Sequence, residues 1–264
     1  MSASPSRSLT FGMRLRSNLL RAPWFFLFTG IFGSLSLLAS CFEKDGRLQH
    51  RIARRWARIS LFFAGAPVEV IGKEHLLPLA IYASNHTSFM DTPVVFSSLP
   101  FQFRILAKQS LWKWPFIGWH LNRSGQIPVD EEGTSGLNSA LRALRSGMPL
   151  FIFPEGGRTE NGQLQPFLKG PAFLAIRAQV PLIPMALIGT YELLPIHSAH
   201  FRPRPVRLVI GEPIDPHGYT LRQSEQLTAR LRDAISRLYR EYSEAPQIPA
   251  QESASPSGAR NVNA

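Results

Sequence analysis

Residues 80–93 read AIYASNHTSFMDTP and contain the turn around which the chain is organised. The apolar run at 80–84 predicts a buried strand, and Thr-Pro at 92–93 behind an aspartate predicts the start of a helix. His86 therefore falls in a strand-to-helix turn, and Asp91 falls near the helix cap. Across such a turn the carboxylate can hold one imidazole nitrogen and leave the other free as a base. This is the His–Asp half of a hydrolase triad, in which the substrate's own hydroxyl would replace the serine.

A structural interpretation of the same turn has to be weighed against the catalytic one. A buried histidine beside a capping aspartate is ordinary protein structure. In a chain with seven histidines, the spacing alone is a weak signal. The rest of the chain therefore decides between the two interpretations.

The composition limits the possible classes of protein. The chain has 264 residues, 44% of them hydrophobic, which is enough for one substantial domain and an appendage. Its single cysteine, Cys41, excludes a disulfide framework and a cysteine-rich metal site. Because Cys41 lies in an apolar segment, an acyl-cysteine intermediate is not expected either.

The net charge of +11 is concentrated near the N-terminus. Residues 1–60 contribute ten basic and two acidic side chains, or +8 of the total. The same quarter of the chain contains its most apolar segment. Basic charge beside a long apolar run indicates an anionic lipid surface rather than DNA. No module for reading nucleic acid accompanies the charge, so nucleic acid is not an expected partner.

Residues 1–65 are predicted to form an N-terminal membrane anchor that begins with an apolar helix at 22–42. This helix contains no charged residue and is long enough to cross or embed in a bilayer. Arginines flank it on both sides, so the positive-inside rule does not favour a simple crossing. A hairpin or monotopic anchor fits better. We therefore expect the protein at the inner (cytoplasmic) membrane, with its active site facing the cytoplasm.

The second part of the anchor is predicted to be a basic amphipathic helix at 47–63. Its large apolar side chains fall within roughly 80° of one another on a helical wheel, with the arginines on another face. These side chains are Leu48, Ile52, Trp56, Ile59 and Phe63. Such a helix can lie in the membrane interface and contact lipid phosphates. It can also dock on the domain that follows, and the two roles are compatible.

A different interpretation of the N-terminus comes from residues 38–41, which read LASC. They resemble a bacterial lipoprotein cleavage box, which would place the rest of the chain outside the cytoplasm. Five arginines within the twelve residues 47–58 oppose this, because they would resist translocation.

Residues 66–244 alternate between strand and helix patterns and are predicted to form one domain. Strands are expected at 68–72, 80–84, 104–107, 125–129, 149–153, 180–187 and 206–211, and helices at 92–98, 133–146, 169–179 and 221–242. This alternation predicts an α/β fold with a mostly parallel, mixed sheet flanked by helices. Residues 245–264, rich in Pro, Ser, Ala, Gln and Asn, are predicted to be a disordered tail.

A second candidate site segment follows the apolar strand at 149–153. Residues 154–159 read PEGGRT, and open α/β sheets place their ligands at such strand ends. Glycine lets backbone N–H groups approach an anion closely, and arginine offers a bidentate fork for phosphate. Lys108 stands at the exit of another strand. The tryptophan-rich residues 111–119 are expected to be partly exposed at a membrane or acyl-chain surface, or else to belong to the core.

Four blocks in this order resemble the lysophospholipid and glycerolipid acyltransferases of the 1-acylglycerol-3-phosphate acyltransferase type. NHTSFMD (85–91) is similar to their N-H-x4-D block, GQIPVD (125–130) to G-x-x-F-I-D-R, FPEGGRT (153–159) to F-P-E-G-T-R-S, and VPLIP (180–184) to V-P-I-V-P. The resemblance covers about residues 20–240. Two positions depart from it. Glu131 stands in place of an arginine that would contact the acceptor's phosphate, and Gly157 stands in place of a threonine.

The resemblance implies a mechanism. His86 would deprotonate the free hydroxyl of a lysolipid, and Asp91 would orient and stabilise the imidazole. The activated oxygen would attack the thioester carbonyl of acyl-CoA or an acyl-carrier protein. The substrate-binding residues would be Lys108, Glu155, Gly156 and Arg158, with Arg158 and Lys108 holding the acceptor's phosphate. No metal or redox cofactor is implied.

The expected function is acyl transfer to 1-acylglycerol-3-phosphate, which gives phosphatidic acid in phospholipid biosynthesis. The departure at Glu131 leaves room for another acceptor, such as lyso-ornithine lipid. A protein that binds lipid surfaces without turnover would be an alternative of a different class. A hydrolase that uses the same dyad on water is a further alternative.

Overall fold

The computed structural model describes residues 21–43, 45–114, 117–130, 135–198 and 200–244. They form one seven-stranded sheet in the order β1-β7-β6-β2-β5-β3-β4. The strands are β1 Val68–Ile71, β2 Ile81–Ser84, β3 Arg104–Lys108, β4 Ile127–Val129, β5 Leu150–Ile152, β6 Leu182–Ile188 and β7 Val206–Ile210. All neighbouring strands are parallel except β6 and β7. The mostly parallel, mixed sheet predicted from the sequence is confirmed.

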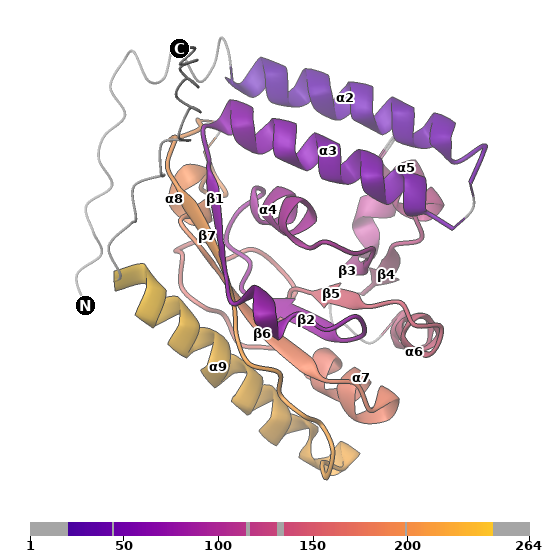
Figure 1. Ribbon diagram of the computed structural model, residues 1–264, viewed down its shortest axis with the longest axis vertical. Coiled ribbons are helices and arrows are strands. Elements are labelled where there is room, and N and C mark those ends of the chain that lie inside the picture. Colours follow the sequence, from indigo (N-terminus) through magenta and orange to yellow (C-terminus); the bar gives the residue numbers. More distant parts are fainter. Residues whose placement is uncertain (1–20, 44, 115–116, 131–134, 199, 245–264) are drawn as a thin grey trace, which may run out of the picture.

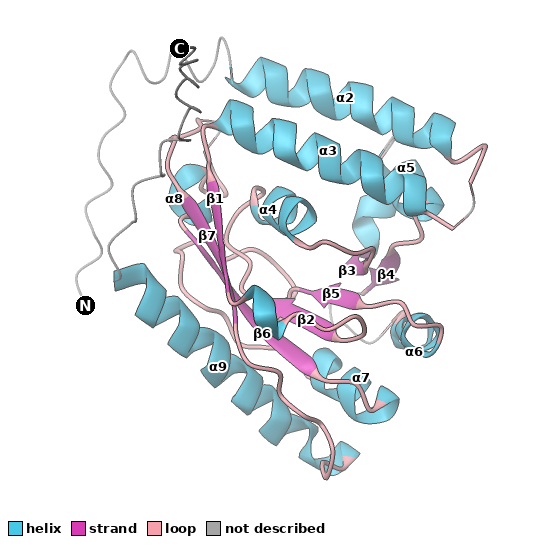
Figure 2. Cartoon of the chain, viewed as in Figure 1, coloured by secondary structure: helices cyan, strands magenta, loops and turns pink. Residues whose placement is uncertain are grey.

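Helices cover both faces of this sheet (Figure 2). They are α2 Ala22–Ala39, α3 Arg47–Ala64, α4 Asp91–Ser98, α5 Ile117–Arg123, α6 Leu137–Arg145, α7 Gly170–Ala178, α8 Thr190–Leu193 and α9 Ser224–Glu244. One buried core joins α3 and α4 to the sheet, and a second core joins α6, α7 and α9 to the opposite face. Side chains alternate between the two cores along β2, as the twofold repeat of a strand requires.

β2 occupies the centre of the sheet and carries the key turn at its end. It pairs with β5 on one side and with β6 on the other, and all four of its residues are buried. This explains the continuous apolar run in the sequence, because a parallel strand covered on both faces has no polar side. The segments that follow β2 and β5 and the segment that follows β6 therefore meet at one edge of the sheet.

The N-terminal helices form an outer layer above α4 (Figure 1). The face of α3 that packs on the domain is made largely of small residues, including Ala53, Ala57 and Ala64. The larger apolar stripe of α3, from Leu48 to Phe63, is half-buried instead.

This half-buried stripe packs against α2 through aromatic rings. The Trp56 ring lies 6.2 Å from that of Phe25, and its Nε1 donates a hydrogen bond of 3.0 Å to Thr29 Oγ1. Phe63 lies 5.2 Å from Phe28. In the structure this stripe therefore packs against α2, and α3 is docked on the domain. A place for α3 in the membrane interface, which is compatible with this docking, stays a prediction.

Two predicted boundaries near the N-terminus and the middle of the chain also differ. α2 ends at Ala39, three residues short of the predicted 22–42. Among the described residues, no helix combines the length and the apolar character that a bilayer crossing requires. α6 begins at Leu137 rather than at 133, because Gly136 before it adopts φ +78°, a left-handed conformation that favours glycine. The predicted start at residues 133–134, the predicted tail at 245–264 and Glu131 lie outside the described residues.

Candidate active site

The turn between β2 and α4 brings His86 and Asp91 together. His86 Nδ1 lies 2.9 Å from Asp91 Oδ2. The Asp91 side chain is fully buried, and the same oxygen accepts backbone N–H bonds from Thr87 at 2.6 Å and Ser88 at 2.8 Å. An ionised carboxylate only accepts hydrogen bonds, so Nδ1 carries the imidazole proton and donates it to Asp91. Nε2 then keeps its lone pair, as a general base requires.

The turn is fixed to the rest of the sheet by Asn85. Its buried amide donates to Leu187 O at 2.9 Å and accepts from Leu187 N at 2.8 Å, so it pairs with the end of β6 as a strand would. Ser88 Oγ donates to Leu194 O at 2.7 Å, beyond α8. This role of Asn85 was not predicted from the sequence. Its place directly before His86, at a strand end, was the available signal.

The second segment holds the backbone of His86 from the other side. Because β5 ends at Ile152, this segment comprises residues 153–159. Glu155 Oε1 accepts the His86 N–H at 2.9 Å, and Thr159 N donates to His86 O at 3.0 Å. Glu155 Oε2 accepts the Gln165 N–H at 2.9 Å. Both carboxylate oxygens of Glu155 therefore hold loop backbone. The assignment of Glu155 to substrate binding stays a prediction, but these contacts favour a positioning role.

Burial raises the pKa of Glu155 to about 7, although the two backbone N–H groups, from Gln165 and His86, pull it down. Burial penalises the charged form, whereas donors aimed at the carboxylate favour it.

An aromatic ring from the second segment restrains the imidazole. Phe153 and His86 stack with ring centroids 3.8 Å apart and an interplanar angle of 13°. Together with Asp91, this contact fixes both the position and the plane of the imidazole. The sequence analysis placed Phe153 in a block but did not anticipate this contact.

Two basic side chains reach the same segment. The Arg158 guanidinium carbon lies 3.4 Å from the centroid of the Phe89 ring. Burial lowers the pKa of Arg158, and the charge of Asp91 opposes that shift. Lys108 is the last residue of β3, and its Nζ would lie 3.8 Å from a Cβ built on Gly157. Of the two predicted phosphate-binding side chains, Arg158 therefore belongs to the second segment, and Lys108 lies close to it at Gly157.

Gly156 shapes the turn of this segment. Its φ of +69° is left-handed, and a Cβ there would lie 3.0 Å from Leu168 Cδ1. Glycine is thus required by the backbone itself. The structure places all six predicted site residues at one edge of the sheet. Within the described residues, no group of three or more His, Cys, Asp or Glu side chains could hold a metal ion.

Comparisons with known proteins agree with this architecture. Residues 67–188 match the family model described as Acyltransferase, and this part of the chain belongs to that family. A chloroplastic 1-acyl-sn-glycerol-3-phosphate acyltransferase of Arabidopsis thaliana is 32% identical over 180 residues, which are 65% of this chain and 49% of the plant protein. The corresponding chloroplastic protein of Brassica napus is 31% identical over 64% of this chain and 51% of its own length. The chain thus spans about half the length of these two relatives.

A bacterial structure matches the fold along almost the whole chain. The crystal structure of the 1-acyl-sn-glycerophosphate (LPA) acyltransferase PlsC from Thermotoga maritima superposes with a TM-score of 0.76 and 24% identity. The match covers 89% of this chain and 100% of that one. At this identity the likeness establishes the fold.

Proposed function

We propose that the protein transfers an acyl group from an acyl thioester to the free hydroxyl of 1-acylglycerol-3-phosphate, giving phosphatidic acid. The observation that carries the proposal is the His86–Asp91 pair, with its 2.9 Å contact and a free Nε2. Two cations lie beside it, Arg158 on the adjacent segment and Lys108 at the end of β3. The names of the plant relatives support the same acceptor.

The reaction follows from the geometry of the pair. His86 Nε2 takes the proton from the acceptor hydroxyl as the oxygen attacks the thioester carbonyl. Asp91 stabilises the imidazolium that forms, through its bond to Nδ1. The tetrahedral intermediate then collapses, and the carbon–sulfur bond breaks. His86 returns the proton to the departing sulfur, which leaves as the free thiol. General base catalysis of this kind contributes about 10²–10⁴-fold, and positioning supplies much of the remainder.

The cations are assigned to the acceptor's phosphate. Arg158 offers a planar fork of donors for two phosphate oxygens, and Lys108 adds a point charge from the end of β3. Gly156 contributes a backbone turn free of side-chain bulk, and Glu155 fixes the loop that carries these groups. The acyl donor is the thioester of either coenzyme A or an acyl-carrier protein.

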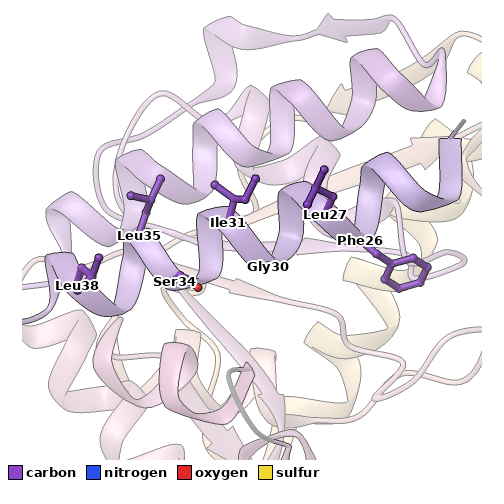
Figure 3. Close-up of a pocket in the computed structure, with 7 residues that line it drawn as sticks. All are labelled: Phe26, Leu27, Gly30, Ile31, Ser34, Leu35 and Leu38. Atoms are coloured by element: carbon purple, nitrogen blue, oxygen red, sulfur yellow. The ribbon is translucent and has the colours of Figure 1, made fainter.

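The outer layer is assigned to an anionic membrane surface. Large apolar side chains lie exposed along α2: Phe26, Leu27, Ile31, Leu35 and Leu38 (Figure 3). Arg51, Arg55 and Arg58 lie exposed on α3, and Trp114 and Trp119 lie exposed before and within α5. Apolar and aromatic groups flanked by arginine suit an interfacial site on anionic lipid.

In this proposal residues 1–65 are the anchor, 66–244 the catalytic domain and 245–264 a tail. The enzyme sits on the inner membrane, with its site open to the cytoplasm.

An acceptor panel tests the proposed function. Purified protein in mixed micelles is given labelled acyl-CoA or acyl-carrier protein together with 1-acylglycerol-3-phosphate, lysophosphatidylcholine or lyso-ornithine lipid. We expect labelled phosphatidic acid as the main product and none with the His86→Ala variant. Transfer to lyso-ornithine lipid alone would replace the proposed acceptor. Lipid binding without transfer to any acceptor would favour the non-catalytic alternative, and release of free fatty acid would favour a hydrolase.

A further inference from the structure

Phe89 is the one exposed residue of the turn at 85–91, with 55% of its surface accessible. Its neighbours Ser88 and Met90 are fully buried. The ring is therefore not part of either core. The ring instead contacts a charged side chain, because the guanidinium carbon of Arg158 lies 3.4 Å from its centroid.

Each of the two site segments places an aromatic ring against a side chain of the other segment. Phe153, from the second segment, stacks on His86 of the first at 3.8 Å. In the opposite direction, Phe89 of the first segment lies under the guanidinium of Arg158 in the second. The imidazole of His86 and the guanidinium of Arg158 are thus each restrained by an aromatic ring from the other segment.

The face-on contact leaves the guanidinium suited to binding an anion. A ring contacts the face of the guanidinium, whereas phosphate is bound by N–H groups that point outward in its plane. A carboxylate in the same place would occupy those donors. Within the described chain, Arg158 Nη1 is buried without a hydrogen-bond partner, so the ring is the contact that orients it. An arginine side chain otherwise has much rotamer freedom to lose on binding.

We propose that Phe89 is a positioning residue that holds Arg158 in the orientation needed to bind the acceptor's phosphate. The inference rests on the proposed function, because it concerns the phosphate of the acceptor. Phe89 itself does not contact the reacting atoms; it acts through Arg158.

A double-mutant cycle tests this role. Phe89→Leu, Phe89→Tyr, Arg158→Ala and the double variant Phe89→Leu/Arg158→Ala are compared for acyl transfer. Sn-glycerol 3-phosphate serves as a soluble competitive inhibitor that probes the phosphate site directly. We expect Phe89→Leu to raise the acceptor KM and the inhibition constant roughly 3- to 30-fold, the range of a cation–π contact. The kcat and the KM for the acyl donor should change less than about twofold. Phe89→Tyr, which keeps the ring, should behave like the parent.

The double variant separates the two proposals. If Phe89 acts through Arg158, Phe89→Leu has no further effect once Arg158 is alanine. If Phe89→Leu raises the acceptor KM by the same factor whether residue 158 is arginine or alanine, the positioning role is contradicted. An acceptor KM unchanged by Phe89→Leu in a chain where Arg158→Ala raises it also contradicts that role. If Arg158→Ala itself leaves the acceptor KM and the inhibition constant unchanged, the phosphate site of the proposed function fails instead. Because Phe89 is exposed, Phe89→Leu and Phe89→Tyr should keep the parent's melting temperature.

Discussion

The turn at residues 85–91 and the outer helical layer depart from the usual distribution of residues in opposite ways. In the turn at 85–91, polar side chains are inside: Asn85, Thr87, Ser88 and Asp91 are all buried. Along α2, large apolar side chains are outside. Buried polar groups and exposed apolar faces are the informative exceptions in a folded chain. In the turn, hydrogen bonds within the protein stabilise the buried polar side chains. The outer apolar face of α2, in contrast, is not covered by any part of the described chain.

This difference predicts two kinds of sensitivity. The turn depends on the geometry of single atoms, because Asn85, Ser88 and Asp91 Oδ2 are each held by specific hydrogen bonds. The outer layer depends on the total apolar area and charge that it presents, because no single contact defines it. Substitutions in the two regions should therefore affect different measurements.

The largest effect is expected when the dyad is broken. His86→Ala removes the base, and Asp91→Asn replaces the acceptor that holds Nδ1, so acyl transfer should fall by about 10²–10⁴-fold. His217→Ala is the matched control, since His217 forms an exposed pair with Asp215, 2.5 Å apart, away from the site. Steady-state transfer rates check this. Parental activity in His86→Ala protein would contradict the mechanism.

A smaller loss is expected from Glu155→Gln. The glutamine oxygen can accept one backbone N–H, but its amide donor would face the other N–H, so the two loops would separate slightly. A displacement of this size can cost roughly 10- to 100-fold in rate. We expect the loss in kcat, with the acceptor KM little changed.

The exposed Glu160 of the same loop region provides the control through Glu160→Gln. A rise in acceptor KM at constant kcat would instead support the assignment of Glu155 to substrate binding.

The outer layer is tested by charging its apolar face. Leu27→Glu combined with Leu35→Glu should lower partitioning into anionic vesicles by roughly tenfold or more, because two exposed apolar side chains can no longer enter the lipid. Transfer to a short-chain, water-soluble acceptor should be preserved. Vesicle sedimentation measures the first property, and a solution assay measures the second. Leu221→Glu, at an exposed position on the short helix before α9, is the control. Unchanged partitioning of the double variant would refute the assigned membrane face.

The smallest effect concerns stability at the junction of α3 and α4. Burial, followed by the charge of Arg54, lowers the pKa of His50 to about 4 from an ordinary value of 6.5. The unfolded chain therefore binds a proton at a higher pH than the folded one. Stability from this group is full above pH 6.5 and is lost as the pH falls towards 4, by at most about tenfold in the folding constant per pH unit.

Urea titrations at pH 7 and 5 measure this loss, and His50→Gln should reduce it. Glu155, with its raised pKa, acts in the opposite sense, so the difference between parent and variant isolates His50. An identical pH dependence in the two proteins would contradict this reading of His50.

The parts of the molecule that the sequence predicted are those encoded locally. The strand at 80–84, the helix start and the bond between His86 and Asp91 all lie within one short stretch. The arginine and lysine of the proposed phosphate site could also be located from the sequence, because strand ends of a parallel sheet meet at one edge. The α/β class followed from the alternation of elements.

The rest depended on contacts between distant parts of the chain. The partners of Glu155 are backbone groups, and backbone groups have no sequence signature. The contacts of Phe89 with Arg158 and of Phe153 with His86 could be predicted only by knowing which two loops lie face to face. On α3 the large apolar stripe was the clearest signal in the sequence, but small residues such as Ala53 and Ala57 form the face that packs on the domain. The packing of α2 on that apolar stripe could not be predicted from the sequence of either helix alone.

The bond between Asn85 and Leu187 has a consequence for the order of folding. It joins positions 102 residues apart in the sequence, and the bond between Glu155 and His86 joins positions 69 apart. Contacts of such long range are formed only after much loop closure, so they tend to complete folding rather than begin it. A chain still folding at a lipid surface would thus present Asp91 and His86 without the frame that aims them. We therefore expect that such folding intermediates do not react with acyl thioesters. Recovery of acyl-transfer activity during refolding should then coincide with formation of the complete sheet.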